Sequence, residues 1–398
     1  MYNIEEIQYQ NPHPLQRNQS SIRILQIIDT LNRGGAETWL MHIVRNIDRE
    51  RFQMDFLVHN PTRPGDYSEE IHLFGSRILL CPNLYQPWIY AKNFKYILHE
   101  YGPYDIVHVH AYNYLSGYIL HLAKQFGVPT CIAHSHIDSS LLDSQSIWYK
   151  RLARSLTKWW TTRYATVGLG CSRKAVASLF GNNWARDLRW QVLYYGIDLT
   201  AFRKPIDSVA VRAEFGIPED ALVIGHVGRF AEQKNHQFLL EIAAEVLKQE
   251  PKMYLLLVGE GSLRPQIEQK VDQLGLTNCV IFAGSRSDVP QLMLGVMDVF
   301  LFPSLYEGLG LVLVEAQAAG VPCVFSDVIP EEANVIKQLI HRLSLKQTAS
   351  VWADKVLAVS STLPSIGKAE ALAIMEQSRF NFHKSLDALT KLYESHAN

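Results

Sequence analysis

Residues 302–320 read FPSLYEGLGLVLVEAQAAG, and this stretch decides how the rest of the chain is interpreted. The apolar run VFLF at 299–302 predicts a buried strand, and the Pro-Ser pair that follows it predicts a turn. A helix is then expected to begin near Gly310 and to stop at Gly320, which is followed by a proline. The pattern is therefore a strand, a glycine-rich loop and a helix.

Two glutamates flank the start of this expected helix. Glu307 lies in the loop, and Glu315 lies eight positions later on the second turn. Glycines let a ligand approach the main chain closely, and the free N–H groups of a first helical turn favour an anion. Two carboxylates beside such an anion site suit a molecule with both hydroxyls and phosphates, such as a sugar nucleotide. The residues of the expected anion site are Gly308, Leu309, Gly310 and Leu311.

Composition limits the class of protein. The chain has 398 residues, of which 47% are hydrophobic and 19% charged, as expected for a globular protein of two or three domains. A net charge of −1 argues against a main role in binding nucleic acid, so we expect no nucleic-acid partner. The five cysteines are scattered, and neither a metal-ligand spacing nor an Asp-x-Asp pattern occurs. We therefore expect no structural zinc site and no cofactor.

The polar segment 1–20 predicts a flexible extension, because it lacks the apolar core of a secretory signal. The chain also has no run of about 18 apolar residues that would predict a membrane-spanning helix. We therefore expect a cytoplasmic protein.

Apolar strand patterns alternate with amphipathic helix patterns along the chain, which predicts an α/β fold with two doubly wound parallel sheets. We expect an N-terminal domain over 21–200, a C-terminal domain over 201–379, and an amphipathic helix at 380–398 that packs back on the first domain. The strands expected in the first domain are 22–28, 53–59, 105–110, 129–135 and 166–172, and those in the second are 221–228, 253–259, 280–284, 299–302 and 323–326.

Open parallel sheets bind ligands at the carboxyl ends of their strands, so we expect a cleft between the two domains at these edges. Arg229 and Lys234 follow the strand 221–228, where both cations can reach a diphosphate. Negative charge grows on such a group when it leaves, and fixed cations lower that barrier. The alternative is a pair of solvated surface cations beside a helix start.

In the first domain, Gly34 and Gly35 precede an expected helix and are candidates for binding the donor, although a tight turn is the alternative. His108 and His110 end a strand and point to the same face. We expect His110 to contact the donor sugar, and the other to be satisfied by neighbouring groups. His134 and His136 form a similar pair, and these are candidates for contacting the acceptor.

Two further motifs follow strands of the second domain. Gly259 and Gly261 form a GxG that does not continue as GxGxxG, so it is interpreted as shaping a pocket beside the nucleotide. Arg286 is a candidate contact to the base, with a helix start led by Ser287 or Asp288 as the alternative. In the first domain, the stretch 147–164 mixes Lys and Arg with Trp and Tyr, which is typical of a helix on an anionic membrane surface or of an ordinary amphipathic helix.

These motifs together resemble retaining glycosyltransferases of family 4, which have the GT-B fold. The resemblance rests on the Gly-Gly loop, the strand-final histidine, GR-x4-K, GEG and E-x7-E followed by EAQAAGVPCV. It covers nearly the whole chain after residue 21, and the wording of SDVIPEEANV is similar to the exopolysaccharide and capsule subgroup.

The resemblance implies that Arg229 and Lys234 bind the diphosphate, that Glu307 contacts the donor sugar, and that Glu315 takes the ribose hydroxyls. It also implies metal independence and transfer of a hexosyl unit, with retention, from a nucleotide sugar such as a UDP-sugar to a glycan or lipid-linked acceptor. Two alternatives stay open. One is a non-hydrolysing sugar-nucleotide epimerase, although the first half shows no paired carboxylates for it; the other is a non-catalytic subunit of a glycan-assembly complex.

Overall fold

The computed structural model describes residues 21–59, 65–84, 86–111, 116–138, 148–362 and 366–397. These residues form two compact units, and the chain crosses between them twice. Unit 1 extends to Tyr195 and resumes at His383, whereas unit 2 extends from Gly196 to Phe382. The expected boundaries lay a few residues away, at 200/201 and 379/380.

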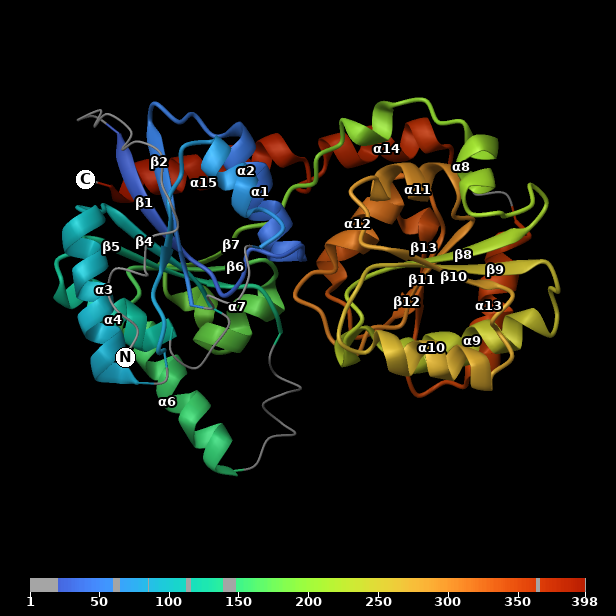
Figure 1. The fold of residues 1–398 in the computed structure, drawn as a ribbon, viewed down its shortest axis with the longest axis horizontal. Helices are drawn as coiled ribbons and strands as arrows, with labels where there is room; N and C mark the ends of the chain where they lie inside the picture. Colours follow the sequence, from blue (N-terminus) through green and yellow to red (C-terminus); the bar gives the residue numbers. More distant parts are fainter. Residues whose placement is uncertain are drawn as a thin grey trace. The chain divides into compact units, whose positions relative to one another are not determined.

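Unit 1 is built on a seven-stranded sheet in the order β3-β2-β1-β4-β5-β6-β7 (Figure 1). Every neighbouring pair is parallel. Helices cover both faces, as the α/β prediction required. The strands are β1 (Ile22–Ile27), β2 (Phe52–Val58), β3 (Ile78–Leu80), β4 (Ile106–Ala111), β5 (Thr130–Ser135), β6 (Val167–Gly170) and β7 (Trp190–Val192). The helices are α1 (Gly35–Asn46), α2 (Ser68–Leu73), α3 (Pro87–Tyr101), α4 (Ser116–Gln125), α6 (Trp148–Tyr164), α7 (Arg173–Phe180) and α15 (Phe382–His396).

Unit 2 has a six-stranded, all-parallel sheet in the order β10-β9-β8-β11-β12-β13. Its strands are β8 (Leu222–Val227), β9 (Met253–Val258), β10 (Val280–Gly284), β11 (Val299–Phe302), β12 (Cys323–Ser326) and β13 (Ile340–Leu343). Its helices are α8 (Ser208–Glu214), α9 (His236–Leu247), α10 (Arg264–Gln273), α11 (Val289–Gly295), α12 (Leu311–Ala318), α13 (Ala349–Ser360) and α14 (Lys368–Gln377).

All ten expected strands are present, and the two predicted parallel sheets are confirmed. The sequence analysis missed β3, β7 and β13. β3 and β7 have only three residues each, and the four residues of β13 (IHRL) include a histidine and an arginine, so none of the three offers a recognisable apolar pattern. All three are edge strands of their sheets, and edge strands are often short.

The strand order reverses once in each sheet, between β1 and β4 in unit 1 and between β8 and β11 in unit 2. Because all strands are parallel, their carboxyl ends lie at one edge of each sheet, and the loops diverge where the order reverses. That position is the usual ligand site of an open α/β sheet. The loops after these four strands are therefore the expected positions of ligand-binding residues.

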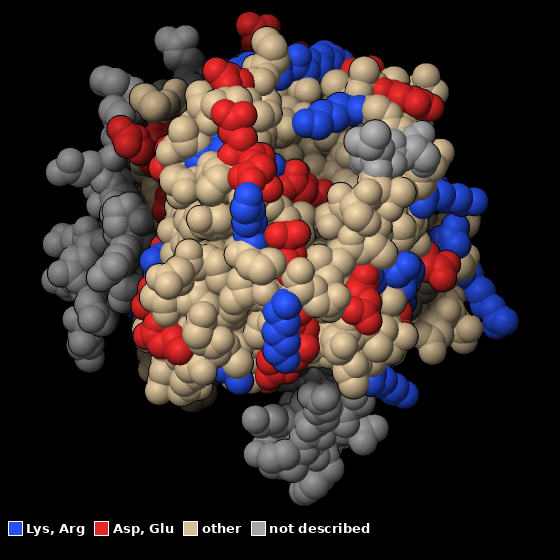
Figure 2. Space-filling view, turned by 90° about the vertical axis from the view of Figure 1, so that its right-hand side faces the viewer, with Lys and Arg blue, Asp and Glu red and all other residues tan. Residues whose placement is uncertain are grey.

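The face of unit 2 that Figure 2 presents carries basic and acidic side chains interspersed with uncharged ones. No single sign of charge dominates this face, in keeping with the net charge of −1. Such a mixed surface lacks the extended basic field that attracts nucleic acid.

Candidate functional site

In unit 2 the predicted residues gather where the strand order reverses. The loop after β8 contains Arg229 and Lys234, and the loop after β11 contains Glu307. These strands are far apart in sequence but are direct neighbours in the sheet. Asn235 joins the two loops, because its Nδ2 donates to the carbonyl of Pro303 at 3.1 Å. The fold therefore brings together two motifs that the sequence keeps separate.

Lys234 and Glu307 form an ion pair at this position. Lys234 Nζ lies 2.5 Å from Glu307 Oε1, and the two side chains are only 14% and 8% exposed. The ammonium nitrogen also lies 4.7 Å from the centroid of the Phe302 ring. Because water reaches little of the pair, its attraction is screened less than that of a surface ion pair.

Gln233 holds the second oxygen of the same carboxylate, a role that the sequence analysis missed. Its Nε2 donates to Glu307 Oε2 at 3.2 Å and to the carbonyl of Tyr306 at 2.9 Å. Its own carbonyl accepts from the N–H of Leu305 at 2.8 Å. Gln233 directly precedes Lys234 in the motif, but nothing in the sequence shows which way its side chain points.

Arg229 differs from Lys234 because its charge is available. The residue is exposed, and no carboxylate within the described ranges pairs with its guanidinium group. An anionic ligand at this edge of the sheet would therefore meet one free cation and one cation that already has a counter-ion.

The glycine-rich loop leads into α12 as the pattern predicted. Gly310 adopts the left-handed conformation (φ 83°) and is the N-cap of α12, so its conformation turns the chain into the helix. Glu315 lies on this helix, and burial raises its pKa to about 7. Its carboxyl group therefore exists in both protonation states near neutral pH, and hydrogen-bond donors on a ligand would favour the ionised form.

Gly259 and Gly261 have a clear role in packing. A Cβ at Gly259 (φ 139°) would clash with the carbonyl of Gly228, and one at Gly261 would clash with the carbonyl of Phe230. The glycines thus let the loop after β9 lie directly against the loop that contains Arg229. Their predicted place in a donor pocket stays a prediction.

Arg286 is held by carboxylates in this structure. Its guanidinium donates to both oxygens of Asp288 at 2.8 and 2.7 Å and to Glu214 at 2.8 Å. These two partners raise its pKa further above the usual value of arginine. The arrangement favours the alternative of a helix start, since Asp288 is the N-cap residue of α11, over a free contact to a base.

In unit 1, Gly34 is the N-cap of α1 and follows β1, next to the reversal of strand order. A Cβ at Gly34 would clash with the carboxylate of Glu37, which is in the first turn of the helix. A carboxylate there is favoured by the helix dipole. The first turn of α1 thus holds a carboxylate of the protein beside Gly34, and the predicted role of Gly34 and Gly35 in binding the donor stays a prediction.

The histidines of unit 1 form one hydrogen-bonded cluster on the sheet face that is opposite the large apolar cluster under α3 and α4. Strand register explains their meeting, because Gln26 on β1 pairs with His108 on β4, and His110 pairs with His134 on β5. Two tyrosines complete the cluster from the points where the chain leaves and re-enters unit 1. The seven members are Gln26, His108, His110, His134, His136, Tyr195 and Tyr393.

One half of the cluster runs from Gln26 to His134. Gln26 Nε2 donates to the hydroxyl of Tyr393 at 3.0 Å. The hydroxyl of Tyr393 lies 2.8 Å from His108 Nδ1, and His108 Nε2 lies 3.1 Å from His134 Nδ1. Since the hydroxyl accepts from the amide, it donates to His108, which in its neutral form then donates from Nε2 to His134.

The other half closes the ring. His134 Nε2 lies 3.0 Å from the hydroxyl of Tyr195, which also bonds His136 Nδ1. His136 Nε2 lies 2.8 Å from His110 Nδ1, and His110 Nε2 lies 2.9 Å from Gln26 Oε1. If each group donates in the same direction around the ring, every imidazole is neutral and carries its proton on Nε2. All eight ring nitrogens are then satisfied in one closed circuit.

Neutral imidazoles are also what burial favours. It lowers the pKa of His108 and of His136 to about 3, and holds those of His110 and His134 well below the usual value. A second proton on any ring would leave a donor without an acceptor inside the circuit. The predicted contact of His110 with a sugar stays a prediction, and it would require His110 to exchange a bond to Gln26 or His136.

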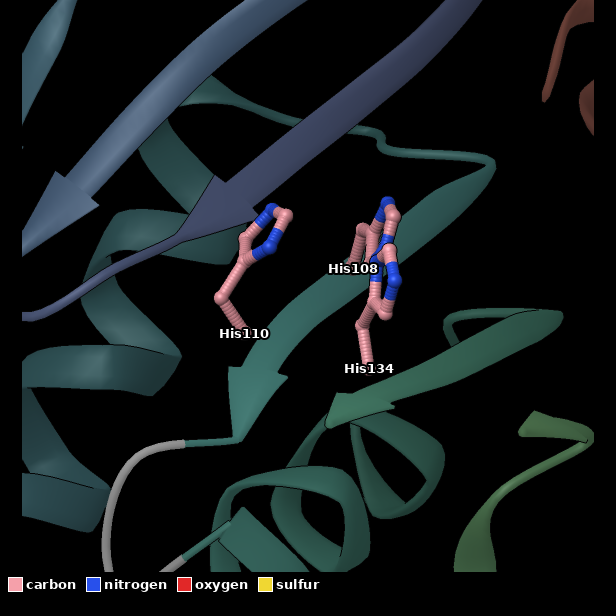
Figure 3. Close-up of side chains that lie close together, drawn as sticks. All are labelled: His108, His110 and His134. Carbon is pink, nitrogen blue, oxygen red and sulfur yellow. The ribbon is translucent and has the colours of Figure 1, made fainter. Parts of the chain in front are cut away.

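Figure 3 shows His108, His110 and His134. One ring nitrogen from each lies within 4.8 Å of the others, close enough for three imidazoles to hold a metal ion. A metal needs a free lone pair from each ligand. Here every nitrogen of the three rings is engaged in a hydrogen bond, so metal binding would break the circuit. The geometry favours a hydrogen-bonded cluster.

A cavity of about 800 Å³ lies in unit 2 beside Leu222 and Asp298, at the amino ends of β8 and β11. It is therefore at the opposite edge of the sheet from Lys234 and Glu307. Its cations are already bound, since Arg212 pairs with Asp298 at 2.8 Å and Lys368 donates to the carbonyl of Leu294 at 2.6 Å. Its size alone does not make it a functional site.

The circuit predicts loss of stability in acid. The folded pKa of His108 and His136 lies below the unfolded value of about 6.5, so the unfolded chain binds more protons between pH 6.5 and 3. Stability is therefore complete above pH 6.5 and falls as the pH drops, by about 2 kcal/mol for each of these two residues at pH 5. Urea unfolding at pH 7 and pH 5 measures this loss. An unchanged midpoint would show that these imidazoles accept protons in the fold.

Comparisons with known proteins agree with this architecture. Residues 33–201 match the family described as Glycosyltransferase Family 4, and residues 208–362 match the one described as Glycosyl transferases group 1. EpsF of Bacillus subtilis (strain 168), provisionally described as a glycosyltransferase, is 38% identical over 343 residues, covering 85% of this chain and 88% of EpsF. A UDP-Gal:alpha-D-GlcNAc-diphosphoundecaprenol alpha-1,3-galactosyltransferase of Escherichia coli is 25% identical over 71% of this chain and 73% of its own length.

Among solved structures, Anabaena HepE in complex with UDP and glucose superposes with a TM-score of 0.77 at 20% identity, over 94% of this chain and 100% of HepE. At that identity the likeness shows the fold. Together with the extent of the match to EpsF, it leads to one conclusion: the chain belongs to glycosyltransferase family 4 and has the GT-B fold.

Proposed function

We propose that this protein transfers a hexosyl unit from a nucleotide sugar, with a UDP-sugar as the first choice, to a hydroxyl of a glycan or lipid-linked acceptor in polysaccharide biosynthesis. The transfer retains the anomeric configuration. The observation that carries the proposal is the meeting of Arg229, Lys234 and Glu307 where the strand order of unit 2 reverses.

Each of these groups suits one part of such a donor. The two cations can bind the diphosphate and stabilise the charge that grows on it as the bond to the sugar breaks. The carboxylate of Glu307 accepts hydrogen bonds, which sugar hydroxyls can donate. In the proposed front-face reaction, the C1–O bond to the phosphate breaks while the acceptor oxygen bonds C1 from the same side, and the leaving phosphate takes the acceptor proton.

The choice of a UDP-sugar draws on two relatives. The E. coli relative is named for UDP-Gal and an undecaprenol-linked acceptor, and HepE was solved with UDP and glucose and also with UDP-glucose. Glu315, whose pKa is about 7, is the proposed partner of the ribose hydroxyls. We also propose that no metal is needed, because Arg229 and Lys234 provide the positive charge at the phosphate.

We further propose that the protein works in the cytoplasm, at the inner surface of the membrane where lipid-linked acceptors lie. Within the described residues no helix is long and apolar enough to cross a membrane. The contact would be made by α6, on which Leu152, Leu156 and Trp159 are 56%, 56% and 58% exposed. Their spacing puts all three on one stripe of the helix, and the opposite side packs against Gly117 of α4. Arg163 extends the stripe with a charge that suits anionic lipids.

The proposed reaction is tested by acceptor-dependent release of nucleoside diphosphate. A thermal-shift screen over UDP-glucose, UDP-galactose and UDP-N-acetylglucosamine selects the donor, because binding raises the apparent melting temperature. We expect UDP release only when a glycan or polyprenol-linked acceptor is added. Isomerised UDP-sugar without acceptor would instead identify an epimerase, and binding without either product would identify a non-catalytic subunit.

Replacing either cation should remove most of the activity. We expect Arg229→Ala or Lys234→Ala to lower turnover by about 10²-fold or more, because each leaves the departing diphosphate with one cation. Lys248→Ala is the matched control, since that lysine is 67% exposed and pairs only with a neighbour on its own helix. A loss below about threefold for Arg229 or Lys234 would contradict the assigned role.

The contact of α6 with membranes is tested by sedimentation with liposomes. We expect binding to anionic vesicles, weaker binding to neutral ones, and a loss of binding in Leu156→Glu/Trp159→Glu, because two charges interrupt the apolar stripe. Leu188→Glu is the control, since Leu188 is 97% exposed outside the stripe. Equal sedimentation of the double variant and the control would rule out the contact.

A further inference from the structure

Lys234 is neutralised before any ligand arrives. Its ammonium group lies 2.5 Å from Glu307 Oε1, and both side chains are mostly buried. If this site binds the diphosphate of the donor, as the proposed function requires, the anion must therefore compete with a carboxylate of the protein itself.

We infer that Glu307, oriented by Gln233, is a built-in counter-ion that makes the site prefer the nucleotide sugar to the bare nucleoside diphosphate. Glu307 thus determines specificity between donor and product. This inference rests on the proposed function, and it explains why the nucleoside diphosphate dissociates after the sugar has been transferred.

Binding of a diphosphate changes the surroundings of Glu307. Once phosphate oxygens attract Lys234, Glu307 Oε1 loses its partner while its side chain is only 8% exposed. A buried carboxylate without a partner, next to another anion, is strongly unfavourable. The unfavourable free energy of that state weakens the binding of any diphosphate at this position.

The sugar of a bound donor offers Glu307 a new partner. A nucleotide sugar carries hydroxyl groups that can donate to the freed oxygen of Glu307, so the carboxylate regains a hydrogen bond. The bare nucleoside diphosphate has no hydroxyl group beyond its terminal phosphate. A bound nucleoside diphosphate therefore leaves Glu307 without a hydrogen bond, whereas a bound nucleotide sugar supplies one. As a result, Glu307 weakens the binding of the nucleoside diphosphate more than that of the nucleotide sugar.

Gln233 is the positioning residue in this arrangement. Its Nε2 holds Glu307 Oε2 at 3.2 Å and the carbonyl of Tyr306 at 2.9 Å, while Lys234 holds Oε1. With each oxygen tied to a different partner, the plane of the carboxylate is fixed. The contact also links the loop after β8 to the loop after β11, so the orientation of Glu307 is established before a ligand binds.

The test compares dissociation constants of wild-type protein and Glu307→Gln for UDP, for the UDP-sugar that the thermal-shift screen selects, and for inorganic pyrophosphate. Removing the like charge beside the anion should tighten UDP and pyrophosphate by about tenfold or more. The UDP-sugar should keep or lose affinity, so that the ratio of the UDP to the UDP-sugar dissociation constant falls at least about tenfold. Gln233→Leu should change this ratio in the same direction by about threefold, because a carboxylate with one partner is displaced more easily.

Glu232→Gln is the matched control. It removes one negative charge from the same loop, but Glu232 is exposed and Lys234 pairs with Glu307. It should alter each dissociation constant less than about twofold. Thermal melts of the variants establish that all of them fold.

If Glu307→Gln weakens UDP and pyrophosphate, or changes UDP and UDP-sugar equally, the inference is overturned. Its failure is separable from that of the proposed function. A wild-type protein that releases no UDP with any acceptor would contradict the transferase proposal. The pyrophosphate comparison would still show whether Glu307 is the counter-ion that an anion must displace.

Discussion

The parallel direction of every strand is the constraint on which this structure depends. In a parallel sheet all carboxyl ends lie at one edge, and a reversal of strand order at one position separates the loops there. Unit 2 puts Arg229, Lys234 and Glu307 into those loops, and unit 1 puts Gly34 and the histidine strand β4 beside the corresponding position. The same backbone rule thus produces one candidate ligand edge in each unit.

The two edges are chemically opposite. In unit 1 the polar side chains satisfy one another in a closed circuit of neutral groups, which leaves no ring nitrogen of the four histidines for a new partner. In unit 2 the side chains are charged, and Arg229 has no ion-pair partner within the described part of the chain. A buried neutral circuit gives rigidity, whereas exposed charge gives affinity for an anion. This difference in charge is the basis for the anion site proposed in unit 2.

Much of this could be predicted from the sequence, because strand ends and loop residues are local features. The ten predicted strands and the helix after Gly310 follow from apolar runs and from glycine and proline placement, and His110 lies one residue before the end of β4 at Ala111. Strand order is not local, so the contact between Lys234 and Glu307 could not be read from residues 73 positions apart. Side-chain direction is not local either, which is why Gln233 was missed and why the two alternatives for Arg286, a contact to the base or a helix start, stayed open until its bonds to Glu214 and Asp288 were seen.

The circuit in unit 1 links the two parts of the sequence that form this unit. Tyr195 is the last residue before the chain leaves unit 1, and Tyr393 lies on α15, which brings it back. Each hydroxyl bridges two members of the circuit, so without α15 the buried Nδ1 of His108 would lose its donor and Gln26 would lose an acceptor. Gln26 is a fully buried polar residue between Leu25 and Ile27 of β1, and a buried polar group of this kind requires partners. The C-terminal helix is therefore part of the interior of unit 1, because it supplies a hydrogen bond that no other described residue supplies to His108.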